Sequence, residues 1–271
     1  MQPYLPPHLW ARLINASVDS FPPETRAKTV ELLRLRRAGT ARDSWPVFTE
    51  FVLKDDYGDS TELAPIHLSW IEHIQHCWAN GLNPGILSPR GHGKTQQLVA
   101  LVLYEIGRDP NIRVKIVCNS EDEAAKRVQL IGRYVEQSED LRLVFPHLSP
   151  ADRGRWNTSQ LYVQRTGYSV DPTVEAKAVL STGVGGRSGL LIFDDPVDFR
   201  NAISNPALRP KVLEAIQNVW MNTLLPGGRI VLIGTAWHKM DSVHEMMKNP
   251  AFCFLIQKVS QDFNCIESSI V

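Results

Sequence analysis

The chain has no excess charge of either sign. Its 271 residues include 29 lysines and arginines and 29 aspartates and glutamates, so the formal net charge at pH 7 is zero. This balance excludes a global positive field that would draw the chain onto nucleic acid. Contact with DNA would therefore need a local basic strip.

The sequence also lacks the features of secreted, membrane-bound and zinc-binding proteins. The cysteines are Cys77, Cys118, Cys253 and Cys265, and they show no paired spacing. We therefore expect reduced thiols. His73, His76 and Cys77 have helical spacing, but interleaved apolar residues favour ordinary helix positions over a metal site. No stretch reaches the roughly twenty apolar residues of a membrane span, and residues 1–7 lack a signal peptide's charged region.

The composition is that of a folded α/β protein. Apolar residues make up 43% of the chain and charged residues 21%, enough to bury a substantial core. Residues 114–118 form an apolar strand pattern, and Asn119 or Ser120 is placed to cap a helix whose first turn is acidic. This alternation predicts the βαβ order of a mostly parallel central sheet flanked by helices.

The most informative segment is a phosphate-binding loop between an apolar strand and a helical run. It consists of Ser88, Pro89, Arg90, Gly91, His92, Gly93, Lys94 and Thr95. Glycines let backbone N–H groups close around the β- and γ-phosphates of ATP, while lysine adds a charge and threonine ligates Mg²⁺. The helix predicted over 95–107 points its positive end at the same anion.

One position of the loop departs from the usual pattern. Ser88 stands where the first glycine is expected, so a glycine-rich turn without a ligand is the alternative interpretation. If the loop binds phosphate, we expect Lys94 to be a solvent-accessible ligand with little role in the core.

A second motif is an apolar strand that ends in two carboxylates. Residues 190–193 precede Asp194 and Asp195, as in a buried parallel strand whose carboxyl end enters a crevice. Asp194 is placed to hold Mg²⁺, directly or through water, and Asp195 to orient or deprotonate an attacking water. An ordinary turn after a strand is the alternative. Asp198 and Glu175 are reserve candidates for the base.

A third apolar strand, over 229–233, is followed by Thr235. A hydroxyl at the end of a central strand can sense the γ-phosphate. The alternative is that Thr235 caps the turn before a helix predicted over 242–248.

Further elements follow from periodicity and turn residues. Helices are expected over 24–38, 66–79 and 202–223, with a polar linker at 55–59. The first helix carries Arg34, Arg36 and Arg37, a basic cluster for DNA, a neighbouring subunit or water. Segments 160–165 and 173–180 are expected to be strands. Strands inserted between the loop and the acid pair are typical of the additional-strand class of P-loop NTPases.

Together these motifs resemble the ATPase part of the large terminase subunit of tailed bacteriophages. The matching segments are 89–95, 185–187, 191–196 and 234–238 with Asp241. The resemblance covers about residues 65–259 and implies an additional-strand P-loop fold. It implies an ATPase with Mg²⁺ that couples hydrolysis to translocation of viral double-stranded DNA into a capsid, in the host cytoplasm.

The resemblance also suggests partners and further site residues. The segment 65–67, with His67, lies where this family contacts adenine, and Arg187 is the candidate for a finger donated to a neighbour's ATP. A surface charge is the alternative for Arg187, and Arg90 could reach the γ-phosphate of its own subunit. Expected partners are DNA bound without sequence preference, the capsid portal, the small terminase subunit, and copies of the chain in a ring.

We expect three parts: an N-terminal helical region and linker at 1–62, the ATPase core at 63–259, and a tail at 260–271. Proteins of this family carry a C-terminal nuclease, but twelve residues after 259 are too few for a domain. We therefore expect no nuclease activity from this span. An excised motor domain and a natural short form both stay open.

Two rival functions also stay open. A helicase-like or repair DNA translocase shares all three strand-end motifs but needs a second α/β domain. A non-hydrolysing, ATP-gated assembly module would bind ATP without using Asp195. Most motors of this class have glutamate at that position, so the shorter side chain must bring its carboxylate closer or act through another water.

Overall fold

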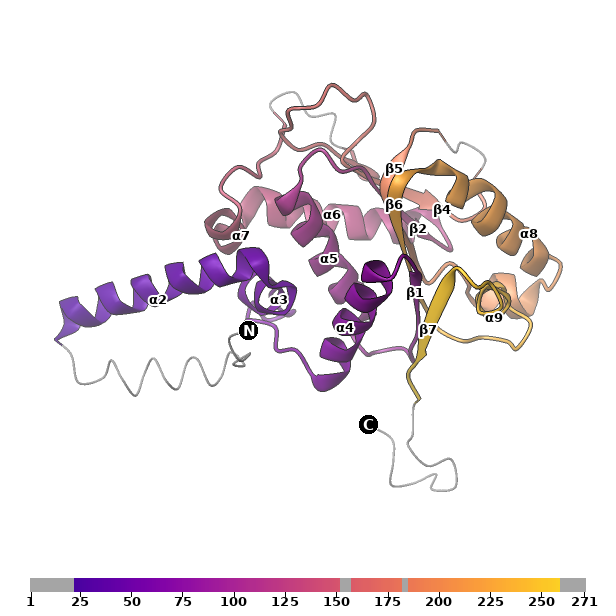
Figure 1. Cartoon of the computed structure of the whole chain (residues 1–271), viewed down its shortest axis with the longest axis horizontal. Coiled ribbons are helices and arrows are strands. Elements are labelled where there is room, and N and C mark those ends of the chain that lie inside the picture. The colour runs from indigo at the N-terminus through magenta and orange to yellow at the C-terminus, as the bar shows by residue number, and fades with distance from the viewer. Residues whose placement is uncertain (1–21, 152–156, 182–184, 259–271) are drawn as a thin grey trace, which may run out of the picture.

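The centre of the protein is a seven-stranded sheet in the order β3-β4-β2-β5-β6-β1-β7, seen in a computed structural model that describes residues 22–151, 157–181 and 185–258 (Figure 1). All pairings between these strands are parallel except that of β3 with β4. The expected mostly parallel α/β sheet is therefore confirmed. The strands are β1 (Asn83–Leu87), β2 (Val114–Cys118), β3 (Gln160–Leu161), β4 (Val174–Ala178), β5 (Ser188–Asp194), β6 (Leu224–Gly234) and β7 (Phe252–Ile256).

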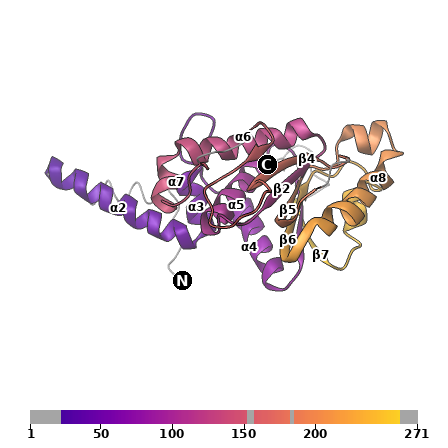
Figure 2. The same cartoon turned by 90° about the horizontal axis from the view of Figure 1, so that it is seen from above.

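Helices cover both faces of the sheet (Figures 1 and 2). One face packs against α3 (Trp45–Val52), α4 (Pro65–Ala79), α5 (Lys94–Arg108) and α6 (Glu121–Gln137), with α7 (Glu139–Val144) beside them. The other face packs against α8 (Leu208–Glu214), the π-helical turn η2 (Ala215–Trp220) and α9 (Ser242–Met246).

Strand β5 contributes to both cores because its side chains alternate between the two faces. Leu190 and Ile192 belong to the cluster beneath α3 to α6, whereas Leu191 and Phe193 belong to the cluster beneath α8 and α9. All four side chains are fully buried. A continuous apolar run is what a central parallel strand requires.

The additional strand is β6, which lies between β1 and β5 in the sheet. The predicted strands at 160–165 and 173–180 instead form β3 and β4 at the far edge, beyond β2. The fold class is confirmed. The strand that lies between β1 and β5 in the sheet, however, follows the acid pair in the sequence instead of preceding it. Parallel strands are joined by crossovers, so order in the chain does not give order in the sheet.

The N-terminal helix α2 (Pro23–Asp43) extends away from the body, and its C-terminal end packs on it (Figure 1). Arg34 pairs with Asp140 at 2.8 Å and Arg37 with Glu50 at 3.4 Å, so two of the three arginines of the predicted basic cluster contact the chain itself. Trp45 of α3 belongs to the same buried cluster as residues of α4, α5 and α6.

The expected linker at 55–59 is a tight turn in which Asp55 Oδ1 accepts hydrogen bonds from two backbone N–H groups. Residues on both sides of position 62 share one core. The proposed domain boundaries stay predictions, and residues 1–21 and 259–271 lie outside the described residues.

The helix predicted over 202–223 is broken into several pieces. It comprises the π-helical turn η1 (Arg200–Ser204), α8, η2 and the 3-10 turn η3 (Met221–Thr223). Pro206 interrupts the first turns because proline disfavours helical backbone in the residue before it, and Asn205 is non-helical at ψ 82°. Within the described ranges, no helix has the length and apolarity needed to cross a bilayer.

Candidate nucleotide site

The loop between β1 and α5 turns on two glycines in left-handed backbone conformation. Gly91 has φ 79° and Gly93 has φ 72°, a region that residues with a Cβ adopt at a cost. Gly93 immediately precedes α5. The free N–H groups of the first helical turn therefore face the loop, as an anion site requires.

Lys94 is folded back against this loop. Its Nζ donates hydrogen bonds to the carbonyl oxygens of Ser88 (3.0 Å) and Pro89 (2.8 Å) and to Thr235 Oγ1 (3.0 Å). Only 5% of the residue is exposed, so the expectation of a solvent-accessible lysine is wrong. Burial lowers the pKa of Lys94, while the neighbouring carboxylates of Asp195 and Asp194 oppose that shift. Three oxygen acceptors hold the ammonium group in place of solvent.

Asp194 ends β5 and is completely buried. Its Oδ2 accepts hydrogen bonds from Arg127 Nε at 2.9 Å and from Thr95 Oγ1 at 3.4 Å. Its Oδ1 is buried without a hydrogen-bond partner. Burial raises the pKa of Asp194, and the adjacent Arg127 partly offsets this. The two predicted metal ligands therefore lie together, and a free carboxylate oxygen fits the oxygen-donor chemistry of Mg²⁺.

Asp195 has positive φ, 46°, although it is not glycine. Such strain in a non-glycine residue occurs mainly where the surrounding structure enforces it. Here the backbone N–H of Asp195 donates to Ile233 O at 2.9 Å, and Asp195 Oδ1 accepts from Thr235 N at 2.8 Å. The turn brings Asp195 to the same cavity as Asp194.

Thr235 connects the three motifs. Its hydroxyl accepts from Lys94 Nζ and its backbone N–H donates to Asp195. The helix cap is a different residue, because Asp241 accepts from His244 N at 2.9 Å at the start of α9. The structure therefore places Thr235 at the site, apart from the helix terminus.

Arg127 is the site residue that the sequence did not reveal. It lies on α6, its side chain is 14% exposed, and its Nη1 donates to Glu123 Oε2 at 2.6 Å while its Nε reaches Asp194. Its spacing from Glu123 is a common helix pair. Nothing in that spacing indicates a contact with a strand 67 residues later.

Lys94, Thr95, Arg127 and the acid pair line one cavity of about 500 Å³ at the carboxyl edge of the sheet. Arg90 lies at this cavity with its Cζ 4.5 Å from the centroid of the Trp237 ring, a cation–π contact. The lining residues are Arg90, Gly91, Gly93, Lys94, Thr95, Gln96, Cys118, Asn119, Glu123, Arg127, Asp194, Asp195, Val197, Asp198 and Trp237.

The structure distinguishes between the two reserve candidates for the base, Asp198 and Glu175. Asp198 lines the cavity, but Asn119 Nδ2 donates to its Oδ2 (2.9 Å) and Asn201 N to its Oδ1 (2.8 Å). Glu175 lies on β4, outside the cavity lining, where it pairs with Lys177 at 3.1 Å. The geometry does not support Glu175 as a base.

His67 contacts the loop, not the cavity. Its Nδ1 accepts from Ala64 N at 3.2 Å, so Nε2 carries the proton and donates to His92 O at 3.1 Å. Burial lowers the pKa of His67. The neutral ring therefore links the first turn of α4 to the loop through two hydrogen bonds. The expected contact of His67 with adenine stays a prediction.

Arg187 lies at the other end of β5 from the acid pair. It is exposed, and its Nη1 donates to Asn222 O at 2.9 Å. A seven-residue strand separates it from Asp194 by roughly 20 Å. Arg187 cannot reach the nucleotide site of its own chain.

No family model matches the chain. Over 181 residues, or 66% of the chain, the sequence is 24% identical to the large terminase subunit of Enterobacteria phage T3, and this match spans 30% of that protein. The fold is similar to the crystal structure of the HK97 bacteriophage large terminase, with a TM-score of 0.52 and 17% identity over 82% of this chain and 44% of that chain. A mutant ATPase domain of the Thermus phage P74-26 large terminase aligns with a TM-score of 0.48 and 14% identity, over 73% of this chain and 82% of that chain.

The resemblance to large terminase subunits inferred from the motifs is confirmed by the similarity to the T3 protein. The likeness to the HK97 structure agrees with the additional-strand P-loop fold. The chain spans less than half the length of these two relatives.

Proposed function

We propose that the chain is a DNA-packaging ATPase motor, which hydrolyses ATP with Mg²⁺ and couples hydrolysis to movement of viral double-stranded DNA into a capsid in the host cytoplasm. The observation that carries this proposal is the convergence of Lys94 and the acid pair on one cavity behind a glycine loop, with Thr235 hydrogen-bonded to both Lys94 and Asp195. The similarity to the T3 large terminase supports the packaging role.

Thr95 and Asp194 are the residues that would hold Mg²⁺, which neutralises charge on the phosphate oxygens when it is bound with ATP. Arg127 supplies a positive charge beside the same two residues. Its Nε lies on Asp194 Oδ2, and its Nη2 is 3.5 Å from Thr95 Oγ1. Asp194 Oδ1, which has no hydrogen-bond partner among the described residues, is the oxygen left for the metal while Arg127 stays on Oδ2.

Asp195 is the proposed base for the attacking water. Oδ1 is held by the backbone N–H of Thr235, so the carboxylate has a fixed orientation toward the cavity. Lys94 and the N–H groups of α5 bind the phosphates, and Thr235 senses the γ-phosphate through its bond to Lys94. Arg90, at the cavity beside Trp237, is the proposed arginine acting within one subunit.

Arg187 is the proposed finger for a neighbour's ATP. It is exposed and lies far from the cavity of its own chain, so the role requires assembly of several copies into a ring. The other proposed partners are the capsid portal, the small terminase subunit and double-stranded DNA contacted through its phosphates.

Phosphate release by the purified chain tests the ATPase proposal. We expect turnover that requires Mg²⁺, stops with EDTA and increases when double-stranded DNA or assembly on a portal is provided. Asp195→Asn should abolish it, whereas Glu175→Gln, a carboxylate on the same sheet outside the cavity, should leave it near the wild-type rate.

Two outcomes would favour the rival functions. ATP binding without turnover under every assembly condition supports the nucleotide-gated assembly module. DNA-stimulated turnover without any binding to a portal supports a repair or helicase-like translocase.

A further inference from the structure

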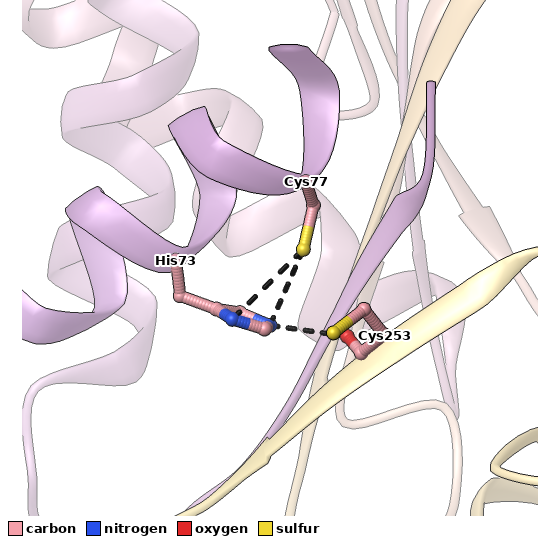
Figure 3. Close-up of side chains that lie close together, drawn as sticks. All are labelled: His73, Cys77 and Cys253. Carbon is pink, nitrogen blue, oxygen red and sulfur yellow. Dashed lines mark hydrogen bonds between the residues drawn. The ribbon is translucent and has the colours of Figure 1, made fainter. Parts of the chain in front are cut away.

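His73, Cys77 and Cys253 converge where α4 packs against β7, away from the nucleotide cavity (Figure 3). One ligand atom from each side chain lies within 4.8 Å of the others, and among the described residues this is the only such group of three. His73 and Cys77 are one helical turn apart, whereas Cys253 lies 180 residues beyond His73. The fold thus assembles a cluster that the cysteine spacing does not indicate.

The side chains are held in place by the backbone. His73 Nε2 lies 3.0 Å from the carbonyl oxygen of Cys253, and a carbonyl only accepts, so Nε2 donates and Nδ1 keeps its lone pair. A histidine whose second nitrogen donates to a backbone carbonyl is the common arrangement at metal sites. Cys77 is fully buried, and His73 and Cys253 are half-buried, so the cluster has one closed side and one side toward water.

The spacing fits a tetrahedral metal. Zn–S and Zn–N bonds of about 2.3 and 2.1 Å place a sulfur and a nitrogen ligand about 3.6 Å apart. Cys77 Sγ lies 3.9 Å from His73 Nδ1, the nitrogen that keeps its lone pair. Small side-chain rotations would therefore suffice to bring the ligand atoms to bonding distance.

We propose that His73, Cys77 and Cys253 bind one zinc ion. One imidazole and two thiolates are the donors that zinc prefers, whereas Mg²⁺ takes oxygen donors. Water occupies the fourth position on the half-buried side. This site is independent of ATP hydrolysis and of the proposed packaging function.

A metal here would fix the edge of the sheet. Strand β7 pairs with β1 from Asn83↔Phe252 to Leu87↔Ile256, and the phosphate loop begins directly after β1. The zinc ligands join β7 to α4, which also packs on β1. Because the site forms only in the folded chain, metal binding would add to the stability of the strand beneath the loop.

Metal content and cobalt spectroscopy of the intact, nucleotide-free chain test the proposal. We expect about one zinc per chain, and Co²⁺ replacement should give the absorption of a cobalt–thiolate centre. Removal of zinc by a chelator should lower the Tm. His73→Gln and Cys253→Ser should weaken zinc binding by more than about 100-fold, beyond the usual effect of losing an outer-shell partner.

Two matched variants control for other sites. His76→Gln changes a histidine on the same helix outside the cluster, and Cys118→Ser removes the thiol at the nucleotide cavity. Both should keep the cobalt–thiolate spectrum. Cys77 is fully buried, so the test relies on the two half-buried ligands, with circular dichroism confirming that each variant folds.

The proposal is overturned if the wild-type chain binds no stoichiometric zinc, or if folded His73→Gln and Cys253→Ser variants bind it as the wild type does. Loss of the spectrum in Cys118→Ser would place the metal at the nucleotide cavity and also exclude this site. Preferential retention of copper over zinc would overturn the assignment of the metal.

Discussion

Arg127 and Asp194 form a buried ion pair between α6 and the end of β5, with 2.9 Å between Nε and Oδ2. The carboxylate is 0% exposed and the guanidinium side chain 14%. A buried carboxylate without a cation is strongly destabilising, and Arg127 supplies the cation for Asp194. The proposed metal would bind Oδ1 of the same carboxylate, so both positive charges stabilise its ionised form.

Replacing Arg127 by glutamine should destabilise the nucleotide-free protein by about 3 kcal/mol, the loss typical when one partner of a buried pair is removed. Mg–ADP should reduce the difference, because the metal then supplies the missing charge. Denaturant unfolding with and without Mg–ADP measures both effects. Arg133→Gln, an exposed position on the same helix, is the control and should change little. Equal deficits with and without Mg–ADP would contradict a metal ion at Asp194.

The loss of stability in Arg127→Gln should depend on pH. Burial raises the pKa of Asp194 above its value in the unfolded chain. Burying the charged carboxylate lowers the free energy of unfolding, and this loss is absent at a pH below the unfolded pKa. The loss grows as the pH rises through the folded pKa. Without Arg127 the folded pKa rises further. The stability deficit of Arg127→Gln should therefore be smaller at pH 5 than at pH 8, and a deficit independent of pH would exclude this explanation.

The two acids should respond differently to neutral substitution. Asp194→Asn should weaken Mg²⁺-linked nucleotide binding, whereas Asp195→Asn should bind Mg–ATP normally and lose about 10²- to 10⁴-fold in turnover, the usual contribution of a general base. Nucleotide titration and single-turnover hydrolysis separate the effects. If Asp195→Asn hydrolyses near the wild-type rate, Asp198 becomes the leading candidate for the base. Of the two reserve candidates, Asp198 lines the cavity and Glu175 does not.

Lys94 and Thr235 should be coupled. Lys94→Ala should abolish turnover while the protein stays folded. Thr235→Val removes an acceptor of a charged hydrogen bond and should cost about 1 to 3 kcal/mol with slowed hydrolysis. Thr235→Ser keeps the hydroxyl and serves as the control. Thermal unfolding and phosphate release check the set, and a Thr235→Val protein that matches Thr235→Ser in both would remove Thr235 from the mechanism.

Arg187 should act only between subunits. Arg187→Ala should bind ATP almost normally yet hydrolyse it about 10³- to 10⁵-fold more slowly, the range known for arginine fingers. Mixing it with Asp195→Asn subunits, which donate an intact Arg187, should restore turnover. No rescue in mixtures that demonstrably co-assemble would leave Arg90, at the cavity, as the leading arginine.

The sequence predicted the local parts of the site well because each depends on neighbouring residues. Glycines at 91 and 93 adopt the left-handed backbone that the loop needs, and the pattern of 114–118 matches β2. The acidic helix start is capped by Ser120, whose side chain accepts from Glu123 N at 3.3 Å.

The features that the sequence did not predict depend on contacts between distant segments. Arg127 meets Asp194, and Cys253 meets His73, only after the sheet has formed. A lysine that binds phosphate is expected to face water. In the structure, Lys94 Nζ instead donates hydrogen bonds to backbone oxygens of its own loop. The helix predicted over 202–223 is too long because Pro206 separates η1 from α8.

The side chains of β5 alternate between two hydrophobic cores, and this alternation also fixes the positions of Asp194 and Asp195 at the end of the strand. Leu190 and Ile192 serve one core, Leu191 and Phe193 the other, and the strand ends at Asp194 before the left-handed turn at Asp195. Inserting or deleting one residue within the strand would move both acids by one position and, by the same slip, turn every apolar side chain to the wrong face. The register of this strand, and with it the placement of the acid pair, is thus protected by the packing of both layers, since a shifted register would disrupt the sheet before it produced a different candidate site.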